Sequence, residues 1–259
     1  PAIIALRDEI QAKYNYPQTV RVGAGGGIGT PAAALAAFML GADYIVTGSI
    51  NQSCVEAGAS EHTRTLLAKA EMTDVAMAPA GDMFEMGVKV QVLKRGTMFA
   101  MRGQKLYDFY SRYDSWQEIP IKEREKLENQ VFKHNFEWVW EECVRFFSER
   151  DPRQIERAEN NPKDKMALVF RWYLGLSSYW SSIGEEGREM DYQIWCGPSM
   201  GAFNDWVRGT YLEEITNRHA ADIAHHIMKG AAFLARVRTL NLQGLRLPSE
   251  ITTYLPKRK

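Results

Sequence analysis

The pattern of apolar and polar residues begins with a helix. Over residues 2–14, Ile3, Ile4, Leu6 and Ile10 recur at helical spacing among charged residues. This spacing is typical of an amphipathic helix that packs one face against another element. We therefore expect this helix to lie on a sheet.

Two apolar runs bounded by glycine then predict two strands, one starting at Val20 and one at Tyr44. Apolar runs without alternation are typical of parallel strands covered on both faces. Between the runs, Thr30 can cap a helix, Pro31 suits its first position, and Gly41 suits its end. The pattern predicts a strand–helix–strand unit with a glycine turn after each strand.

Downstream, the periodicity becomes mostly helical. A helix capped by Ser60, a strand at 88–92 and a helix around 98–113 are expected first. Longer helical patterns follow, ending in a helix over 213–240. We expect three parts: an α/β part, a helical insertion and a carboxyl-terminal helical segment, over residues 1–115, 116–184 and 185–259.

Composition excludes several classes of protein. The 259 residues carry a formal net charge of zero, with 45% hydrophobic and 25% charged residues. These values favour a globular protein and give no indication of a nucleic acid or anionic membrane partner. No apolar run reaches the length of about 20 residues that a membrane-spanning helix needs. Three widely spaced cysteines and five histidines form no metal motif or disulfide framework, which fits the cytoplasm.

The two glycine turns are the candidate cofactor site. Gly25, Gly26 and Gly27 precede the first helix of the unit, and Gly48 and Ser49 follow its second strand. Glycine lets backbone N–H groups approach an anion closely, and a helix N-terminus attracts negative charge. Paired turns of this kind hold cofactor phosphates in barrels of alternating strands and helices.

Two other nucleotide sites fit the spacing poorly. A dinucleotide turn needs the pattern GxGxxG, but from Gly23 the pattern gives Gly25 and then Ile28. A P-loop needs a lysine after the glycines, and none follows here. Tight packing of the helix on the strand stays an alternative role for the glycines, although packing does not require the second turn.

Longer strings carry a family resemblance. GAGGGIG followed by LGADYIVTGS resembles the flavin-phosphate region of the nitronate monooxygenase and FMN-dependent enoyl reductase barrels. FEMGVKVQVLKRGTMFAMRGQKLYDFY, RWYLGLSSYW and IWCGPSMGAFNDWVRGTYLE are similar to the trans-acting enoyl reductases of polyunsaturated fatty acid and polyketide synthesis, the PfaD group. The resemblance covers essentially the whole chain.

This resemblance implies the carboxyl-terminal part of a TIM barrel that carries a helical insertion. It implies an FMN-dependent reduction, with NADPH as reductant, of an α,β-unsaturated acyl thioester on an acyl carrier protein. Gly26, Gly27, Gly48 and Ser49 match the backbone that binds the FMN phosphate, and Gly25 matches it less well. The family's amino-terminal portion is absent, so no catalytic acid or base is assigned and the segment alone is expected to be inactive.

Further features leave alternatives open. The loop from Cys196 to Asn204 either walls the active site or forms a tight turn between helices. Lys163, Lys165 and Arg171 are a candidate docking patch for an acidic carrier protein. A nitronate monooxygenase-like oxidase and a non-catalytic carrier-binding scaffold are the alternative functions, and homo-oligomer formation stays open.

Overall fold

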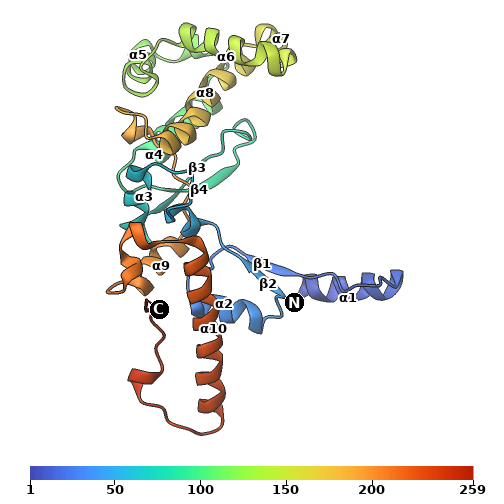
Figure 1. Ribbon diagram of the computed structural model, residues 1–259. Helices are drawn as coiled ribbons and strands as arrows, with labels where there is room; N and C mark the ends of the chain where they lie inside the picture. The colour runs from blue at the N-terminus through green and yellow to red at the C-terminus, as the bar shows by residue number, and fades with distance from the viewer. Residues whose placement is uncertain (259) are drawn as a thin grey trace. The chain divides into compact units, whose positions relative to one another are not determined.

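The computed structural model describes residues 1–258, which divide into two compact units (Figure 1). The first unit joins Pro1–Asp74 to the chain from Cys196 onward, and the second is Val75–Trp195. The chain is α/β and mostly helical. The units have other boundaries than the three parts expected from the sequence, and those parts remain a prediction.

The first unit holds one short sheet and five helices. The elements are α1 (Ala2–Tyr14), β1 (Gly23–Gly25), α2 (Pro31–Met39), β2 (Tyr44–Val46), α3 (Glu61–Ala68), α9 (Ser199–Val207) and α10 (Ala220–Leu242). The helix expected over 213–240 begins later, because two short 3-10 turns occupy the segment before Ala220.

The predicted strand–helix–strand unit is present in the first unit. β1 and β2 pair in parallel, with Gly23 opposite Tyr44 and Gly25 opposite Val46. The strand expected from Val20 begins only at Gly23. The expectation of strands covered on both faces was wrong, since Tyr44 and Val46 remain 48% and 56% exposed. A sheet of two strands and one crossover helix leaves much of its surface uncovered.

The helix between the strands begins and ends as predicted. The Thr30 hydroxyl accepts a hydrogen bond from the Ala33 N–H at 3.3 Å, and Pro31 is the first helical residue. Gly41 follows the helix in the left-handed region, with φ of +95°. α10 packs against α2 (Figure 1), where a Cβ on Gly230 would lie 2.6 Å from the Pro31 ring. The small residue permits this close contact.

The first helix of the chain forms as predicted, but its apolar face has little to pack against. None of the residues of α1 is buried, and Ile3 and Leu6 are more than half exposed. The expected packing of this helix on a sheet is therefore not observed among the described residues.

The second unit combines a hairpin-like sheet with a helical part. Its elements are β3 (Val75–Pro79), β4 (Lys89–Leu93), α4 (Phe99–Arg112), α5 (Ile121–Leu127), α6 (Phe136–Arg150), α7 (Pro152–Asn160) and α8 (Pro162–Ile183). β4 confirms the strand expected at 88–92. It pairs antiparallel with β3, which the sequence analysis did not identify, and α4 packs on β3.

Aromatic side chains fill the core of the helical part. Phe132, Phe136, Phe170 and Tyr173 are fully buried, and the Phe132 ring contacts each of the other three. Rings in such edge-on and tilted contacts stabilise a core beyond the area that they bury. Of the tryptophans in these helices, Trp180 is buried with this core, whereas Trp138 stays 37% exposed.

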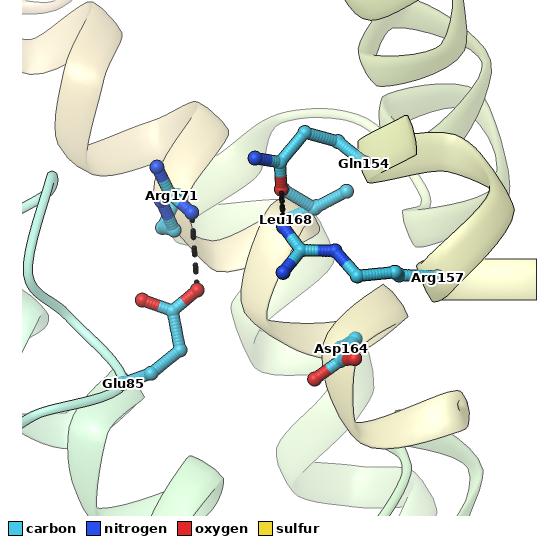
Figure 2. A pocket seen from close by; sticks show the side chains of 6 residues that line it. All are labelled: Glu85, Gln154, Arg157, Asp164, Leu168 and Arg171. Atoms are coloured by element: carbon cyan, nitrogen blue, oxygen red, sulfur yellow. Dashed lines mark hydrogen bonds and ion pairs between the residues drawn. The ribbon is translucent and has the colours of Figure 1, made fainter. Parts of the chain in front are cut away.

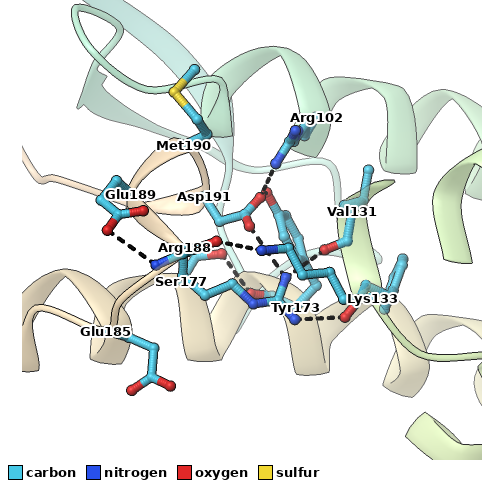
Figure 3. Close-up of polar contacts among 12 residues, drawn as sticks. Arg102, Val131, Lys133, Tyr173, Ser177, Glu185, Arg188, Glu189, Met190 and Asp191 are labelled. Atoms are coloured by element: carbon cyan, nitrogen blue, oxygen red, sulfur yellow. Dashed lines mark hydrogen bonds and ion pairs between the residues drawn. The ribbon is translucent and has the colours of Figure 1, made fainter. Parts of the chain in front are cut away.

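A buried charge cluster joins the end of this helical part to α4 (Figure 3). Asp191, 1% exposed, forms ion pairs with Arg102 and with Arg188, the second at 3.2 Å. The Tyr173 hydroxyl donates to the same carboxylate at 2.9 Å, and Arg188 also donates to the Val131 carbonyl. Because Asp191 has two cations and a hydroxyl around it, its buried charge is compensated.

Residues 1–258 show neither a membrane-spanning helix nor a metal cluster. None of the helices described there is both long enough and apolar enough to cross a membrane. The same residues contain no group of three or more histidine, cysteine, aspartate or glutamate side chains placed to hold a metal ion.

Candidate phosphate-binding site

The two glycine turns begin at the same edge of the first unit's sheet. β1 ends at Gly25 and β2 ends at Val46, and these two residues are register partners in a parallel pair. Because parallel strands place their carboxyl ends at one edge, the turn after Gly25 and the turn at Gly48 leave the sheet side by side. This is the edge at which α/β sheets bind ligands.

The first turn has the geometry of an open backbone cradle. Gly26 and Gly27 have positive φ values of +88° and +72°, which side chains other than glycine adopt only with strain. No atom lies within 4 Å of the position that a Cβ would take on either residue, and both are exposed. Packing against the helix therefore does not require these glycines, and their open positions leave room for the close approach of an anion. The residues fit a phosphate.

The other three candidate residues lie around this cradle. Gly25 belongs to β1, and a Cβ on it would lie 3.9 Å from the Val46 Cβ, so it contributes less open space. Gly48 precedes a short 3-10 turn, η1 (Ser49–Ser53), and is also open. Asn51 lies inside η1, and its side-chain amide donates to the Thr47 carbonyl at 3.0 Å.

The loop that begins at Cys196 contacts both turns. The Gly197 N–H donates to the Ser49 hydroxyl at 2.9 Å. A Cβ on Gly29 would lie 2.3 Å from the Ser199 carbonyl oxygen, so the end of the first turn is pressed against the loop. Sequence reasoning left this loop undecided and did not identify Gly29 or Gly197, because no spacing pattern indicates a contact across so many residues.

Cys196 itself has no catalytic features. Its side chain is buried, and desolvation raises the pKa of the thiol to about 12, with a smaller contribution from Asp74. A thiol with so high a pKa stays protonated near neutral pH and is a poor nucleophile. Cys196 is therefore a small buried residue of the loop.

The candidate docking residues of the second unit already have partners. Arg171 forms an ion pair with Glu85 at 3.0 Å beside a pocket of about 260 Å³ (Figure 2). Lys163 pairs with Asp114 at 3.3 Å, and the Lys165 ammonium lies over an indole ring, 4.6 Å from its centre. These contacts reduce the free positive charge that an acidic partner would meet, and the docking patch remains a hypothesis.

The helical part of the chain is similar to a known protein family. A family described as the inserted helical domain of [acyl-carrier-protein] S-malonyltransferase matches residues 113–192. This match lies close to the helical insertion expected at 116–184.

Curated relatives cover nearly the whole chain. The chain is 47% identical over 247 residues to a polyunsaturated fatty acid synthase component of a Thraustochytrium species, covering 93% of this chain and 16% of that protein. It is 49% identical over 252 residues to the polyketide biosynthesis protein PksE of Bacillus subtilis, covering 97% of this chain and 32% of that protein. The chain thus spans a third or less of the length of these relatives.

One solved structure supports the fold. The crystal structure of the enoyl reductase domain of MlnA, from the macrolactin biosynthesis cluster of Bacillus amyloliquefaciens, superposes with a TM-score of 0.87 at 43% identity. The match covers 92% of this chain and 54% of that domain. The chain therefore corresponds to about half of a solved enoyl reductase domain.

Proposed function

The chain is a homologue of part of the PfaD-type enoyl reductases of polyunsaturated fatty acid and polyketide synthesis, and from this relationship we propose its function. It is the carboxyl-terminal part of an FMN-dependent enoyl reductase that acts in trans on α,β-unsaturated acyl thioesters carried on an acyl carrier protein. NADPH is the proposed reductant, and the remaining strands of the TIM barrel come from a part of the protein that this chain does not contain.

The observation that carries the proposal is the open backbone cradle at Gly26 and Gly27 beside Gly48 and Ser49. In a chain that is 43% identical to an enoyl reductase domain, this cradle supports binding of a flavin phosphate. Backbone N–H groups of the two turns would hold the phosphate, and the positive end of the α2 dipole would favour its charge. The bound flavin would supply the hydride chemistry that no amino acid side chain provides.

The contribution of this chain is therefore positioning of the cofactor. Among residues 1–258, no side chain is assigned as the acid that protonates the α-carbon. We infer that this group lies in the part of the barrel that this chain does not contain.

Substitution of Gly27 by valine tests the phosphate site in the full-length protein. The valine side chain fills the open space and strains a φ of +72°. We expect the FMN dissociation constant to rise about tenfold or more, because at least one charge-assisted hydrogen bond is lost. Titration with FMN, followed by flavin fluorescence, measures the change.

Gly209 provides a matched control. It also has φ of +72° and an open Cβ position. It lies after the carboxyl end of α9, whereas the loop that contacts the two glycine turns lies before the amino end of that helix. The Gly209→Val variant carries the same backbone strain and should bind FMN normally. Equal FMN affinity of the Gly27 and Gly209 variants would overturn the phosphate assignment.

Activity separates the alternative functions. An enoyl reductase oxidises NADPH in the presence of a crotonyl thioester, whereas a nitronate monooxygenase-like oxidase consumes oxygen with a nitronate. A non-catalytic scaffold binds the carrier protein but no FMN. Oxygen uptake with nitronate, without thioester reduction, would contradict the proposed function.

A further inference from the structure

We propose that Gly197 is a positioning residue of the phosphate site and acts through Ser49. This inference rests on the proposed function, because it assigns a role in binding the FMN phosphate. Gly197 lies 148 positions from Ser49 in the sequence, outside both glycine turns, and its N–H donates to the Ser49 hydroxyl at 2.9 Å.

The chemistry of a hydroxyl explains why this contact matters. A serine hydroxyl has one proton to donate and two lone pairs that accept. Since the Gly197 N–H occupies a lone pair, the hydroxyl is turned so that its proton points elsewhere. Ser49 Oγ makes no other hydrogen bond within residues 1–258, so its proton remains available to an anion at the cradle.

The same contact favours a phosphate over a neutral group. A phosphate oxygen can only accept hydrogen bonds, and a hydroxyl that already accepts from an N–H becomes a stronger donor. Gly197 thus makes Ser49 a directed donor, instead of a hydroxyl that rotates between donor and acceptor roles. Gly197 therefore affects binding of the FMN phosphate and not binding of the flavin ring.

The loop is held firmly enough to perform this function. Cys196 is buried directly before Gly197, and Gly29 packs against the Ser199 carbonyl. In α9, which follows the loop, the Asn204 amide donates to the carbonyls of Leu67 and Ala70 at 2.9 and 2.8 Å. These contacts fix the direction of the Gly197 N–H relative to η1.

A double-mutant cycle in the full-length protein tests the proposal. Ser49→Ala removes the hydroxyl, and Gly197→Pro removes the N–H donor. Each variant is titrated with FMN and with riboflavin, which lacks the phosphate. We expect each single variant to weaken FMN binding by about five- to twentyfold, the effect of one charge-assisted hydrogen bond, and to change riboflavin affinity by less than about twofold. If Gly197 acts through Ser49, the double variant is no weaker than either single variant.

Two conservative variants are the controls. Gly197→Ala keeps the N–H and Ser49→Thr keeps a hydroxyl, so both should retain FMN affinity. If Gly197→Pro fails to fold, judged by its thermal transition, Asn204→Ala takes its place. This substitution removes the hydrogen bonds that hold α9 behind the loop without altering either glycine turn, and its loss of FMN affinity should again disappear in the Ser49→Ala background.

Two outcomes would overturn this inference alone: losses of FMN affinity that add in the double variant, or losses of affinity that are equal for FMN and riboflavin. Either outcome would show that the loop has only a structural role. Absence of FMN binding by the wild-type protein would instead overturn the proposed function. The two failures are therefore distinguishable.

Discussion

Burial controls the chemistry of the three thiols in this chain. Cys54, Cys143 and Cys196 are free and buried, and desolvation raises their pKa values to about 11, 12 and 12. Near neutral pH, thiols with such pKa values are protonated and unreactive.

We expect iodoacetamide at pH 8 to leave these thiols unmodified in the folded protein and to label all three in urea. Peptide mass spectrometry of the two samples measures the difference. Rapid labelling of Cys196 in the folded state would contradict its burial and reopen the question of a nucleophile.

Single residues were predicted from sequence where their partners are local. The caps at Thr30 and Ser60 bond to N–H groups three residues ahead, so a short pattern contains the whole interaction. The contact between Gly197 and Ser49 spans 148 positions and leaves no such pattern. The two glycine turns of the candidate site were therefore predicted from the sequence, and the loop against them was not.

At the scale of elements, two helical glycines differ sharply in surroundings. Gly201 in α9 faces the chain after α3, where a Cβ would lie 2.1 Å from the Met72 backbone nitrogen. Gly175 in α8 is exposed, and nothing lies within 4 Å of its Cβ position. We expect Gly201→Ala to destabilise the protein by about 1–3 kcal/mol through overpacking. Gly175→Ala should stabilise it by roughly 0.5–1 kcal/mol, because alanine favours the helix.

Urea unfolding of the two variants measures both effects and each serves as the control for the other. A neutral Gly201→Ala substitution would show that α9 does not pack tightly against the segment at Met72.

Elements whose ends are marked by local residues were predicted from the sequence. Elements that are defined by pairing with a distant strand were not. α2 has proline at its first position and the left-handed Gly41 after its end, so a short pattern contains both signals. β3 ends in Pro79 and contains alanines, so its sequence carries little strand propensity, and only pairing with β4 defines it. The start of β1 depends likewise on where β2 pairs.

At the scale of the whole molecule, the chain corresponds to 54% of the solved enoyl reductase domain. Its first unit has a sheet of two strands and a helix, α1, with no buried residue. Under the proposed function, sheet edges without partners and a barrel lacking its other strands would leave the flavin ring without walls. We expect the segment expressed alone to bind FMN poorly, with a dissociation constant far above that of the full-length protein.

Equilibrium dialysis of the segment and of the full-length protein against FMN makes this comparison, with far-UV circular dichroism as the control for folding. Stoichiometric, tight FMN binding by the segment would show that the two turns suffice without the rest of the barrel. The sequence could not predict the two units, because the first is assembled from both ends of the chain.

The charge cluster around Asp191 limits how the helical part can be moved between proteins. The family match spans residues 113–192 and includes Asp191 and Arg188, but the second cation, Arg102, lies outside it on α4. A chimera that transplants only the matched segment would carry a buried carboxylate with half of its counter-charge. A segment that is transplanted with its buried charge compensated therefore has to include α4.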